Sequence, residues 1–363
     1  MDRREILLGG GAIVAIGAVA TLTSVTGMGS SSDYRATAAA LRTPVADPVR
    51  DIIRHATLAP NGHNTQPWKF RVGAHRIDIL PDLSRRTPVV DPDDHHLFVS
   101  LGCAAANLAL AAAAYGRVGT LAYDPASGGS IAFVSSPGRA TRSPLMDAIP
   151  RRQSTRADFD GRPVASADLR MLAAAAVLPG VDLVLITDRA RIDRVRDLVT
   201  AGNSAQMADP AFVAELKSWL RFNPAAATRA GDGLYSVAGG NPALPDWLGR
   251  RAFGTLVTAK SENKRYARQI NSSAGIAVFS AEQDSKAGWV AVGQACQQFA
   301  LRATALGLKH AFINQPVEVA RLRPDLAALA GIPGRRPDIV MRFGFGPTLP
   351  YSMRRPVDAV IIA

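Results

Sequence analysis

The sequence predicts an α+β protein built from two fused repeats. Helical and strand-like hydrophobic patterns recur in both parts of the 363-residue chain, and 47% of its residues are hydrophobic, which is enough for a sizeable core. A long helix of small and aliphatic residues occurs twice, with Gly102 aligned on Gly293. Identical pairs at this spacing are Ala104 and Ala295, Ala109 and Ala300, Leu110 and Leu301, Ala112 and Ala303, Ala114 and Ala305, and Gly116 and Gly307.

The composition narrows the possible function classes. The formal net charge is +12, and 36 of the 42 basic residues are arginine. A basic balance often indicates nucleic-acid binding, but these arginines are scattered, with no basic tail and no alternation with aromatic residues. We therefore expect no nucleic-acid partner.

The N-terminal segment predicts an export address. Arg3 and Arg4 precede an uncharged, glycine-softened run over residues 6–28, which resembles a twin-arginine export signal. The expected partner is the twin-arginine translocase, and the expected location is the periplasm or cell envelope. Cleavage near residues 18–20 and retention as a membrane anchor are both open, because the run is nearly long enough to span a bilayer. Residues 30–32 are interpreted as a polar linker, with the folded part beginning between Asp33 and Asp47.

In the first half, Asp47 and Pro48 predict the start of a helix, because Asp is a good N-cap and Pro is favoured at the first helical position. Apolar residues at Val49, Ile52, Ile53 and Ala56 keep helical spacing. Further expected elements are strands over residues 77–80 and 131–134 and the repeated helix over 100–115, which ends at a glycine and is followed by an apolar run over 118–122.

The second half repeats this mixture. Ser166 is expected to cap a helix that runs to Ala176. Strands are expected over residues 181–187, 339–345 and 357–362, and the second repeated helix over 291–306. The intervening stretch, residues 209–256, is rich in Gly and Pro and holds one expected helix over 211–220. An insertion of this length is typical of a functional or mobile segment, so we interpret it as a lid.

The two cysteines, Cys103 and Cys296, lie inside apolar helical runs, which favours buried free thiols. A bond between them stays open, because an exported protein can form disulfides. The six histidines and two cysteines show no zinc-ligand spacing, so no metal site is expected.

Three motifs could bind a ligand. In residues 59–68, Pro60 and Gly62 shape a loop on which Asn61 and Asn64 offer amide donors and acceptors. Residues 151–156 combine cationic forks with a hydroxyl, a set that suits a phosphate group. Arg354 and Arg355 form a second basic pair just before the last expected strand.

Together these motifs resemble the FMN-dependent nitroreductase family, and most closely its exported fused-repeat branch of mycobacterial flavin-sequestering relatives. Residues 59–68 match the family's flavin loop, and Arg152, Ser154 and Arg156 match its phosphate-binding motif. The order of residues 307–315 and 329–346 is similar to the family's late elements. The resemblance implies a nitroreductase-like fold over residues 47–363.

In ordinary members the chain is half this length, and each flavin lies across a dimer interface. Here the first half has the flavin loop but residues 41–44 in place of the phosphate motif, whereas the second half has the phosphate motif but only residues 174–180 in place of the loop. The resemblance therefore implies an intramolecular pseudo-dimer, monomeric, with one FMN. The expected division is residues 1–32 for the signal or anchor and linker, 33–150 for the first half, and 151–363 for the second half with its lid.

The resemblance also implies roles for individual residues. No catalytic side chain is expected, because the flavin carries the chemistry. Arg156 would lie near the electron-rich edge of the ring, Asn314 and Gln315 beside it, and Gln66, Pro67 and Trp68 would hold the loop in shape. The expected cofactor-binding residues are Pro60, Asn61, Gly62, Asn64, Arg152, Ser154, Arg156, Asn314, Gln315, Arg354 and Arg355.

Two functions follow from this resemblance. One is an oxidoreductase that passes electrons from NAD(P)H to nitro or quinone-type acceptors. The other is a protein that stores FMN under a closed lid, with Trp219, Phe222 and Trp247 packed over the ring. A membrane-tethered structural domain without flavin is a third interpretation.

Overall fold

The computed structural model describes residues 27–362, so the twin-arginine segment expected over residues 1–26 lies outside the described residues. The folded part begins earlier than the sequence suggested. Ser30 is not a linker residue but the N-cap of a helix, α2 (Ser31–Ala40), and its hydroxyl accepts from the Ser32 N–H. Tyr34 on this helix is buried, with its hydroxyl donating to the Tyr351 carbonyl over 2.7 Å. Burial of that ring makes α2 part of the fold.

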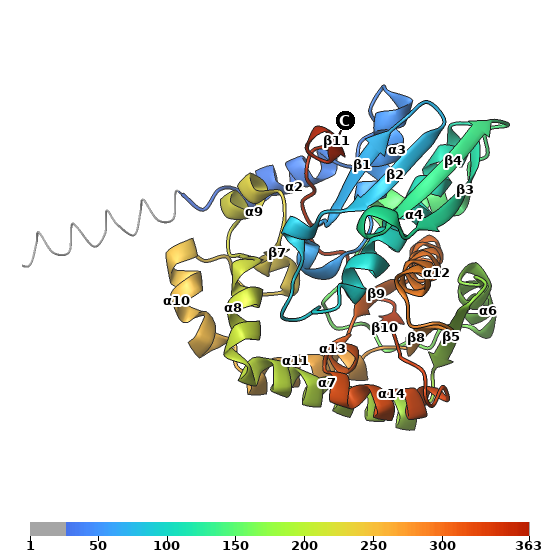
Figure 1. The fold of residues 1–363 in the computed structure, drawn as a ribbon. Coiled ribbons are helices and arrows are strands. Elements are labelled where there is room, and N and C mark those ends of the chain that lie inside the picture. The colour runs from blue at the N-terminus through green and yellow to red at the C-terminus, as the bar shows by residue number, and fades with distance from the viewer. Residues whose placement is uncertain (1–26, 363) are drawn as a thin grey trace, which may run out of the picture.

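Each half of the molecule contains one sheet, antiparallel except for the parallel strand β11 at the edge of the first, and the predicted α+β class is confirmed (Figure 1). Strands of the first half have the order β1-β2-β4-β3, and those of the second half have the order β5-β8-β10-β9. In both sheets the fourth of these strands in chain order lies between the second and the third, so the two sheets share one topology, as expected for a repeat. The strands are β1 (Trp68–Val72), β2 (Arg76–Pro81), β3 (Arg117–Asp124), β4 (Ser130–Pro137), β5 (Val181–Ile186), β6 (Leu220–Arg221), β7 (Leu234–Tyr235), β8 (Gly275–Ala281), β9 (Lys309–Phe312), β10 (Ile339–Gly344) and β11 (Ile361–Ile362).

Helices cover these sheets and fill the space between them. The helices after α2 are α3 (Pro48–Thr57), α4 (His95–Ala114), α5 (Pro144–Ala148), α6 (Ser166–Ala175), α7 (Arg189–Ala208), α8 (Pro210–Ser218), α9 (Pro224–Ala230), α10 (Asp246–Leu256), α11 (Ala259–Asn271), α12 (Lys286–Ala305), α13 (Gln315–Glu318) and α14 (Arg323–Ala330). Short 3₁₀ turns are η1 (Gly62–Asn64), η2 (Leu83–Arg85), η3 (Ala126–Gly128), η4 (Ile149–Arg151), η5 (Ser236–Gly239), η6 (Ala320–Leu322) and η7 (Val357–Ala359).

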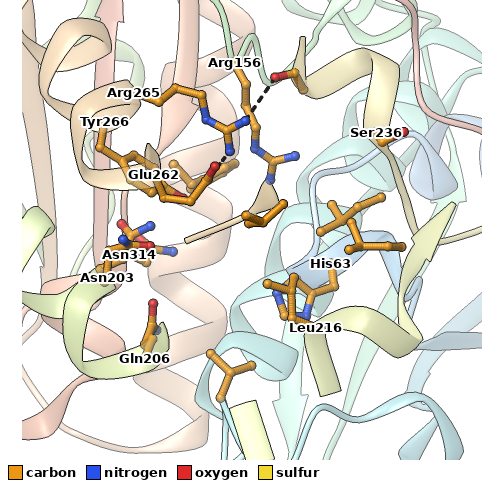
Figure 2. Close-up of a pocket in the computed structure, with 18 of the residues that line it drawn as sticks. His63, Arg156, Asn203, Gln206, Leu216, Ser236, Glu262, Arg265, Tyr266 and Asn314 are labelled. Carbon is orange, nitrogen blue, oxygen red and sulfur yellow. Dashed lines mark hydrogen bonds and ion pairs between the residues drawn. The ribbon is translucent and has the colours of Figure 1, made fainter. Parts of the chain in front are cut away.

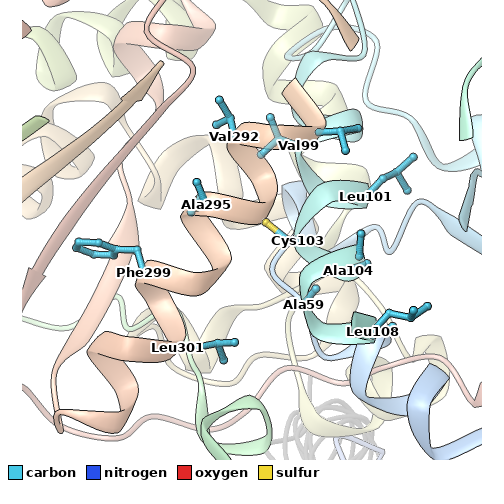
Figure 3. Packing of buried hydrophobic residues seen from close by; sticks show 14 of the residues in the cluster. Ala59, Val99, Leu101, Cys103, Ala104, Leu108, Val292, Ala295, Phe299 and Leu301 are labelled. Atoms are coloured by element: carbon cyan, nitrogen blue, oxygen red, sulfur yellow. The ribbon is translucent and has the colours of Figure 1, made fainter. Parts of the chain in front are cut away.

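The two repeated helices, α4 and α12, cross at the aligned glycines (Figure 3). A Cβ added to Gly102 would overlap the Val290 carbonyl oxygen, and one added to Gly293 would overlap the Val99 carbonyl oxygen. Val99 and Val290 have the same spacing as the two glycines, so the contact is symmetric. The repeat in the sequence is therefore a pseudo-twofold helix crossing that only glycine allows.

This crossing lies in the main hydrophobic core, which contains residues of both halves. Cys103 donates to the Gly293 carbonyl over 3.1 Å, and both cysteines are buried free thiols. Among the described residues, α4 is long and apolar enough to cross a membrane, but most of it is buried inside the protein. We therefore interpret α4 as a core helix.

Two boundary predictions are wrong. Ser166 is the first helical residue of α6 and not its cap, because Ala165 is the extended N-cap residue and no side chain caps this end. Residues 357–362 form the turn η7 and the short strand β11 instead of one strand. β11 pairs in parallel with β1, with Phe70 opposite Ile361, so the C-terminus of the second half completes the sheet of the first.

The insertion over residues 209–256 is largely structured. It contains α8, α9, α10 and the two-stranded pair β6–β7, and α9 packs on α2. The expected helix over 211–220 is α8, which starts at Pro210 because Asp209 caps it. Figure 1 shows α8 and α10 on the flank opposite the sheet of the second half. This segment closes one side of the cavity described next.

Candidate functional site

A cavity of about 650 Å³ lies where the two halves and the insertion meet (Figure 2). Its volume is within the range of small-molecule and cofactor sites. The first half contributes the loop after α3 and the start of α4, and the second half contributes α7, α11 and the segment after β9. Wall residues from the insertion include Phe212, Leu216, Leu220, Phe222, Leu234, Tyr235 and Phe253.

The loop after α3 enters the cavity with an unusual backbone. His63, Asn64 and Gln66 all have left-handed φ values, at 46°, 55° and 55°. Such values are uncommon for residues other than glycine and persist only where surrounding contacts fix them. The Asn61 carboxamide oxygen accepts from the Gln66 N–H over 2.8 Å, which closes the loop on itself. Pro60, Asn61, Gly62 and His63 line the cavity as a result.

The second half faces this loop with a cation. Arg156 projects into the cavity, and its side chain has no hydrogen-bond or ion-pair partner among the described residues (Figure 2). Burial by the surrounding protein lowers the pKa of its guanidinium from the ordinary value. His63 lies opposite, with its pKa lowered to about 4 by burial and by the Arg156 charge, so the imidazole is neutral at pH 7. Arg156 thus brings to the cavity a positive charge that no described residue pairs with.

Asn314 and Gln315 lie on the same wall, just after β9. The Asn314 Oδ1 accepts from the Val340 N–H over 2.9 Å, which ties this segment to β10. The Gln315 Oε1 is buried without a partner among the described residues, as is Nδ1 of His63. Buried polar atoms are usually hydrogen-bonded, and these two belong to residues on the cavity wall, so a ligand or water in the cavity is the available partner.

Comparison with known proteins agrees with this arrangement. The model of the nitroreductase family matches residues 149–346, which is more than half of the chain.

The chain belongs to the nitroreductase family.

Mycobacterium tuberculosis has relatives of nearly the same length. Rv3131, which is named as an NAD(P)H nitroreductase, is 29% identical over 331 residues, covering 88% of this chain and 92% of its own. The protein acg, named in the same way, is 24% identical and covers 86% and 95%.

Solved nitroreductases are more distant. A Desulfitobacterium hafniense nitroreductase with bound FMN is 15% identical, with a TM-score of 0.39 over 61% of this chain and all of that one. The NADPH:FMN oxidoreductase of Vibrio harveyi, complexed with NAD⁺, is 14% identical, with a TM-score of 0.35 over 59% and 73% of the two chains.

Six of the residues predicted to bind a cofactor line the cavity of this nitroreductase-family protein. They come from both halves, as expected for a site at the pseudo-dimer interface, and no observation here tests a contact with a ligand. The six residues are Pro60, Asn61, Gly62, Arg156, Asn314 and Gln315.

The other five predicted residues, Asn64, Arg152, Ser154, Arg354 and Arg355, do not line the cavity. Arg354 donates to the carbonyls of Thr57 and Ala59 at 2.6 and 3.1 Å, and its Nη1 donates to Asn64 Oδ1 at 2.8 Å. Arg152 donates to the Leu58 carbonyl at 3.1 Å, so both cations meet the carbonyl end of α3, where they stabilise unpaired acceptors. Ser154 forms an isolated parallel β-bridge with His310 through the backbone. The Arg355 N–H donates to Gln66 Oε1 at 2.7 Å.

The Asn64 side chain does not face the cavity; it is held by hydrogen bonds to the insertion and to the C-terminal segment. Its Nδ2 donates to the carbonyls of Gly233 and Met353 at 3.1 and 3.2 Å, while Gln66 donates to the Gly231 carbonyl at 2.9 Å. Trp68 is fully buried, which suits the expected role of holding the loop. Side chains of the loop are therefore joined by hydrogen bonds to backbone carbonyls of the insertion.

The prediction of an aromatic cover is wrong for two of its three residues. Phe222 is buried and lines the cavity, but Trp247 is 62% exposed. Trp219 is not on the cavity wall; Arg85 and Arg221 lie over its ring at 5.6 and 6.0 Å. Phe212 and Phe253 supply the aromatic surface instead, because their helices turn them inward.

Several polar wall residues were missed in the sequence. Asn203 and Gln206 continue the buried stripe of α7 formed by Ile192, Val195 and Val199. Polar residues at the end of an apolar helical stripe are a signal that could have indicated a site. His96, Glu262, Arg265, Tyr266 and Glu318 carried no comparable pattern.

Proposed function

We propose that the protein binds one FMN in this cavity and transfers electrons from NAD(P)H to nitro or quinone-type acceptors. The observation that carries the proposal is the joint wall: the loop over residues 60–63 faces Arg156, Asn314 and Gln315 from the other half. Membership of the nitroreductase family and the names of the relatives support it.

The residues present fit the group. A cavity of about 650 Å³ accommodates a ligand of this size, and its wall offers an unpaired guanidinium and unpartnered polar atoms. When bound, FMN supplies two-electron chemistry. Arg156 would stabilise negative charge on the ring, and Gln315 Oε1 would accept from a ring N–H. Nε and Nη1 of Arg152 also have no partner among the described residues, but this buried side chain is not part of the cavity lining.

Flavin content and turnover test this proposal. The purified protein should contain one FMN per chain and run as a monomer in light scattering. NAD(P)H should bleach the flavin spectrum, and a nitro compound or quinone should restore it. Absence of flavin, or two flavins per chain, would contradict the single shared site.

Arg156→Ala should weaken FMN binding by about 1.5–3 kcal/mol, or roughly ten- to a hundredfold in Kd, because a charge-assisted hydrogen bond is lost. Equilibrium titration of the apoprotein measures this. Arg162→Ala is the matched control, since Arg162 forms an exposed ion pair with Asp160 at 2.8 Å. Equal affinities of the two variants would remove Arg156 from the site.

Storage of FMN without turnover is the second candidate, and the insertion favours it. Besides the bonds to Asn64 and Gln66, Asp232 forms an ion pair with Arg85 that ties the insertion to the first half, and a second ion pair with Arg221 within the insertion. A closed wall of this kind would slow the reduction of the flavin by NAD(P)H more than its reduction by dithionite, a small reductant. Turnover of a nitroaromatic at about 1–1000 per second would contradict storage.

A further inference from the structure

We propose that Glu318, held between Gln206 and His96, donates the proton to an acceptor reduced in the cavity. This inference rests on the proposed function and assigns a catalytic residue to it. Three separate elements bring the group together: α13 carries Glu318, α7 carries Gln206, and the first turn of α4 carries His96. All three residues line the cavity that also holds Arg156.

The carboxyl group is fixed by neutral partners. Gln206 Nε2 donates to Glu318 Oε2 over 2.6 Å, and His96 Nε2 lies 3.6 Å from Glu318 Oε1. The backbone beneath it is also fixed, because the Glu318 N–H donates to the Asn314 carbonyl over 2.9 Å. The acid is thus held at a defined place, one helical turn from the residues proposed to face the flavin.

Glu318 differs from the other carboxylates near the cavity. Glu262 is paired with Arg265, and the Asp91 carboxylate accepts from the N–H groups of His96 and Leu97 at 2.9 Å each as a helix cap. No Lys or Arg side chain of the described residues lies within ion-pair distance of Glu318. Its only ion-pair neighbour there is the His96 ring.

Burial favours a protonated acid at Glu318. Burial raises its pKa to about 7, and the Asp91 charge raises it too, while the Gln206 hydrogen bond and the Arg156 charge act in the opposite direction. Burial also holds the pKa of His96 well below its ordinary value, with His95, Arg336 and Arg323 lowering it further and Asp93 opposing them. Near neutral pH the proton of the pair therefore belongs to the carboxyl group.

Such an acid completes the reduction of a quinone-type acceptor. The acceptor gains a hydride equivalent, which is two electrons and one proton, from the reduced protein, and it needs one more proton to become the hydroquinone. The O–H bond of Glu318 breaks as the new O–H bond forms on the acceptor oxygen. A carboxylate remains, which solvent reprotonates. Positioned acids of this kind contribute about a hundredfold or more to rate.

Glu318→Gln tests the inference, because glutamine keeps the size and can still accept from Gln206. In stopped flow, we expect reoxidation of the reduced protein by a quinone to slow about a hundredfold and to lose its pH dependence near 7. Reoxidation by ferricyanide, which takes electrons without protons, should not change. Glu318→Asp should recover part of the quinone rate, and Glu262→Gln should keep the pH dependence.

A measurement without flavin separates this inference from the proposed function. In infrared titration of the apoprotein, the carbonyl band of a protonated carboxylic acid near neutral pH should be smaller in Glu318→Gln than in wild type. Loss of FMN binding with this band present would contradict the proposed function alone. An unchanged band, an unchanged quinone rate, or equal slowing with quinone and ferricyanide would each overturn the role of Glu318.

Discussion

The two halves of the molecule share a scaffold but not a site. Their sheets have the same strand order, and their central helices meet at equivalent glycines. The turns after the equivalent helices differ. α3 leads into the segment over residues 58–67, which has three left-handed residues other than glycine, whereas α6 leads into β5 through the shorter turn over residues 176–180, where only Gly180 is left-handed. Core contacts have therefore kept the symmetry, while the loops at the surface of the core determine where a ligand can bind.

Breaking the symmetric contact should have the largest effect. Gly293→Ala places a methyl group on the Val99 carbonyl oxygen, where backbone must move, so we expect a loss of about 3 kcal/mol in unfolding free energy. Gly102→Ala should cost a similar amount. Gly254→Ala in α10 is the control, because no atom lies within 4 Å of the added group. Urea denaturation measures all three. A small loss at both crossing glycines would contradict the close contact, and clearly unequal losses would contradict its symmetry.

The cavity side should show a pH effect that can be traced to Glu318. The folded-state pKa of Glu318 is raised to about 7, above its unfolded value of about 4.3, so the folded state keeps a proton that the unfolded state has lost. Wild type should therefore lose stability as the pH rises from 5 to 8, by about 2 kcal/mol from this group. Urea denaturation across this range should show Glu318→Gln gaining relative stability; a constant difference would contradict the shift. Glu282→Gln, at an exposed carboxylate, is the control.

Releasing the insertion should have a smaller effect. Asp232→Asn removes the half-buried ion pairs with Arg85 and Arg221, and we expect a loss of about 1 kcal/mol. FMN should exchange faster and NAD(P)H should react faster, which stopped-flow measurements can follow. Asp160→Asn, in an exposed pair with Arg162, should change neither rate. Identical behaviour of the two variants would mean that Asp232 does not hold the insertion closed.

The smallest effect should come from the exposed tryptophan of the insertion. Trp247→Ala removes a side chain that is 62% exposed, so FMN affinity and reduction rate should stay at wild-type values. Phe222→Ala is the comparison, because its ring is buried on the cavity wall, and its loss should weaken FMN binding and speed reduction. A strong effect of Trp247→Ala would require an insertion arranged differently from this structure.

The sequence by itself determined the α+β class, the repeat and the family resemblance. Local patterns indicate these features: the N-cap at Asp47, the glycine of each central helix, and the loop over residues 59–68. It also indicated that Pro60, Asn61, Gly62, Arg156, Asn314 and Gln315 belong to one site, which the structure brings to one cavity.

Only the tertiary structure decided which side chains face that cavity. The contacts at the end of α3 are made by Arg152, Asn64 and Arg354, which join the halves there. Trp247 points to solvent, although other residues of the insertion line the cavity. Glu318, Gln206 and His96 meet from three distant elements. The physical reason is that a local sequence pattern fixes backbone conformation and apolar periodicity, whereas the partner of a polar side chain depends on which segments the fold packs against it.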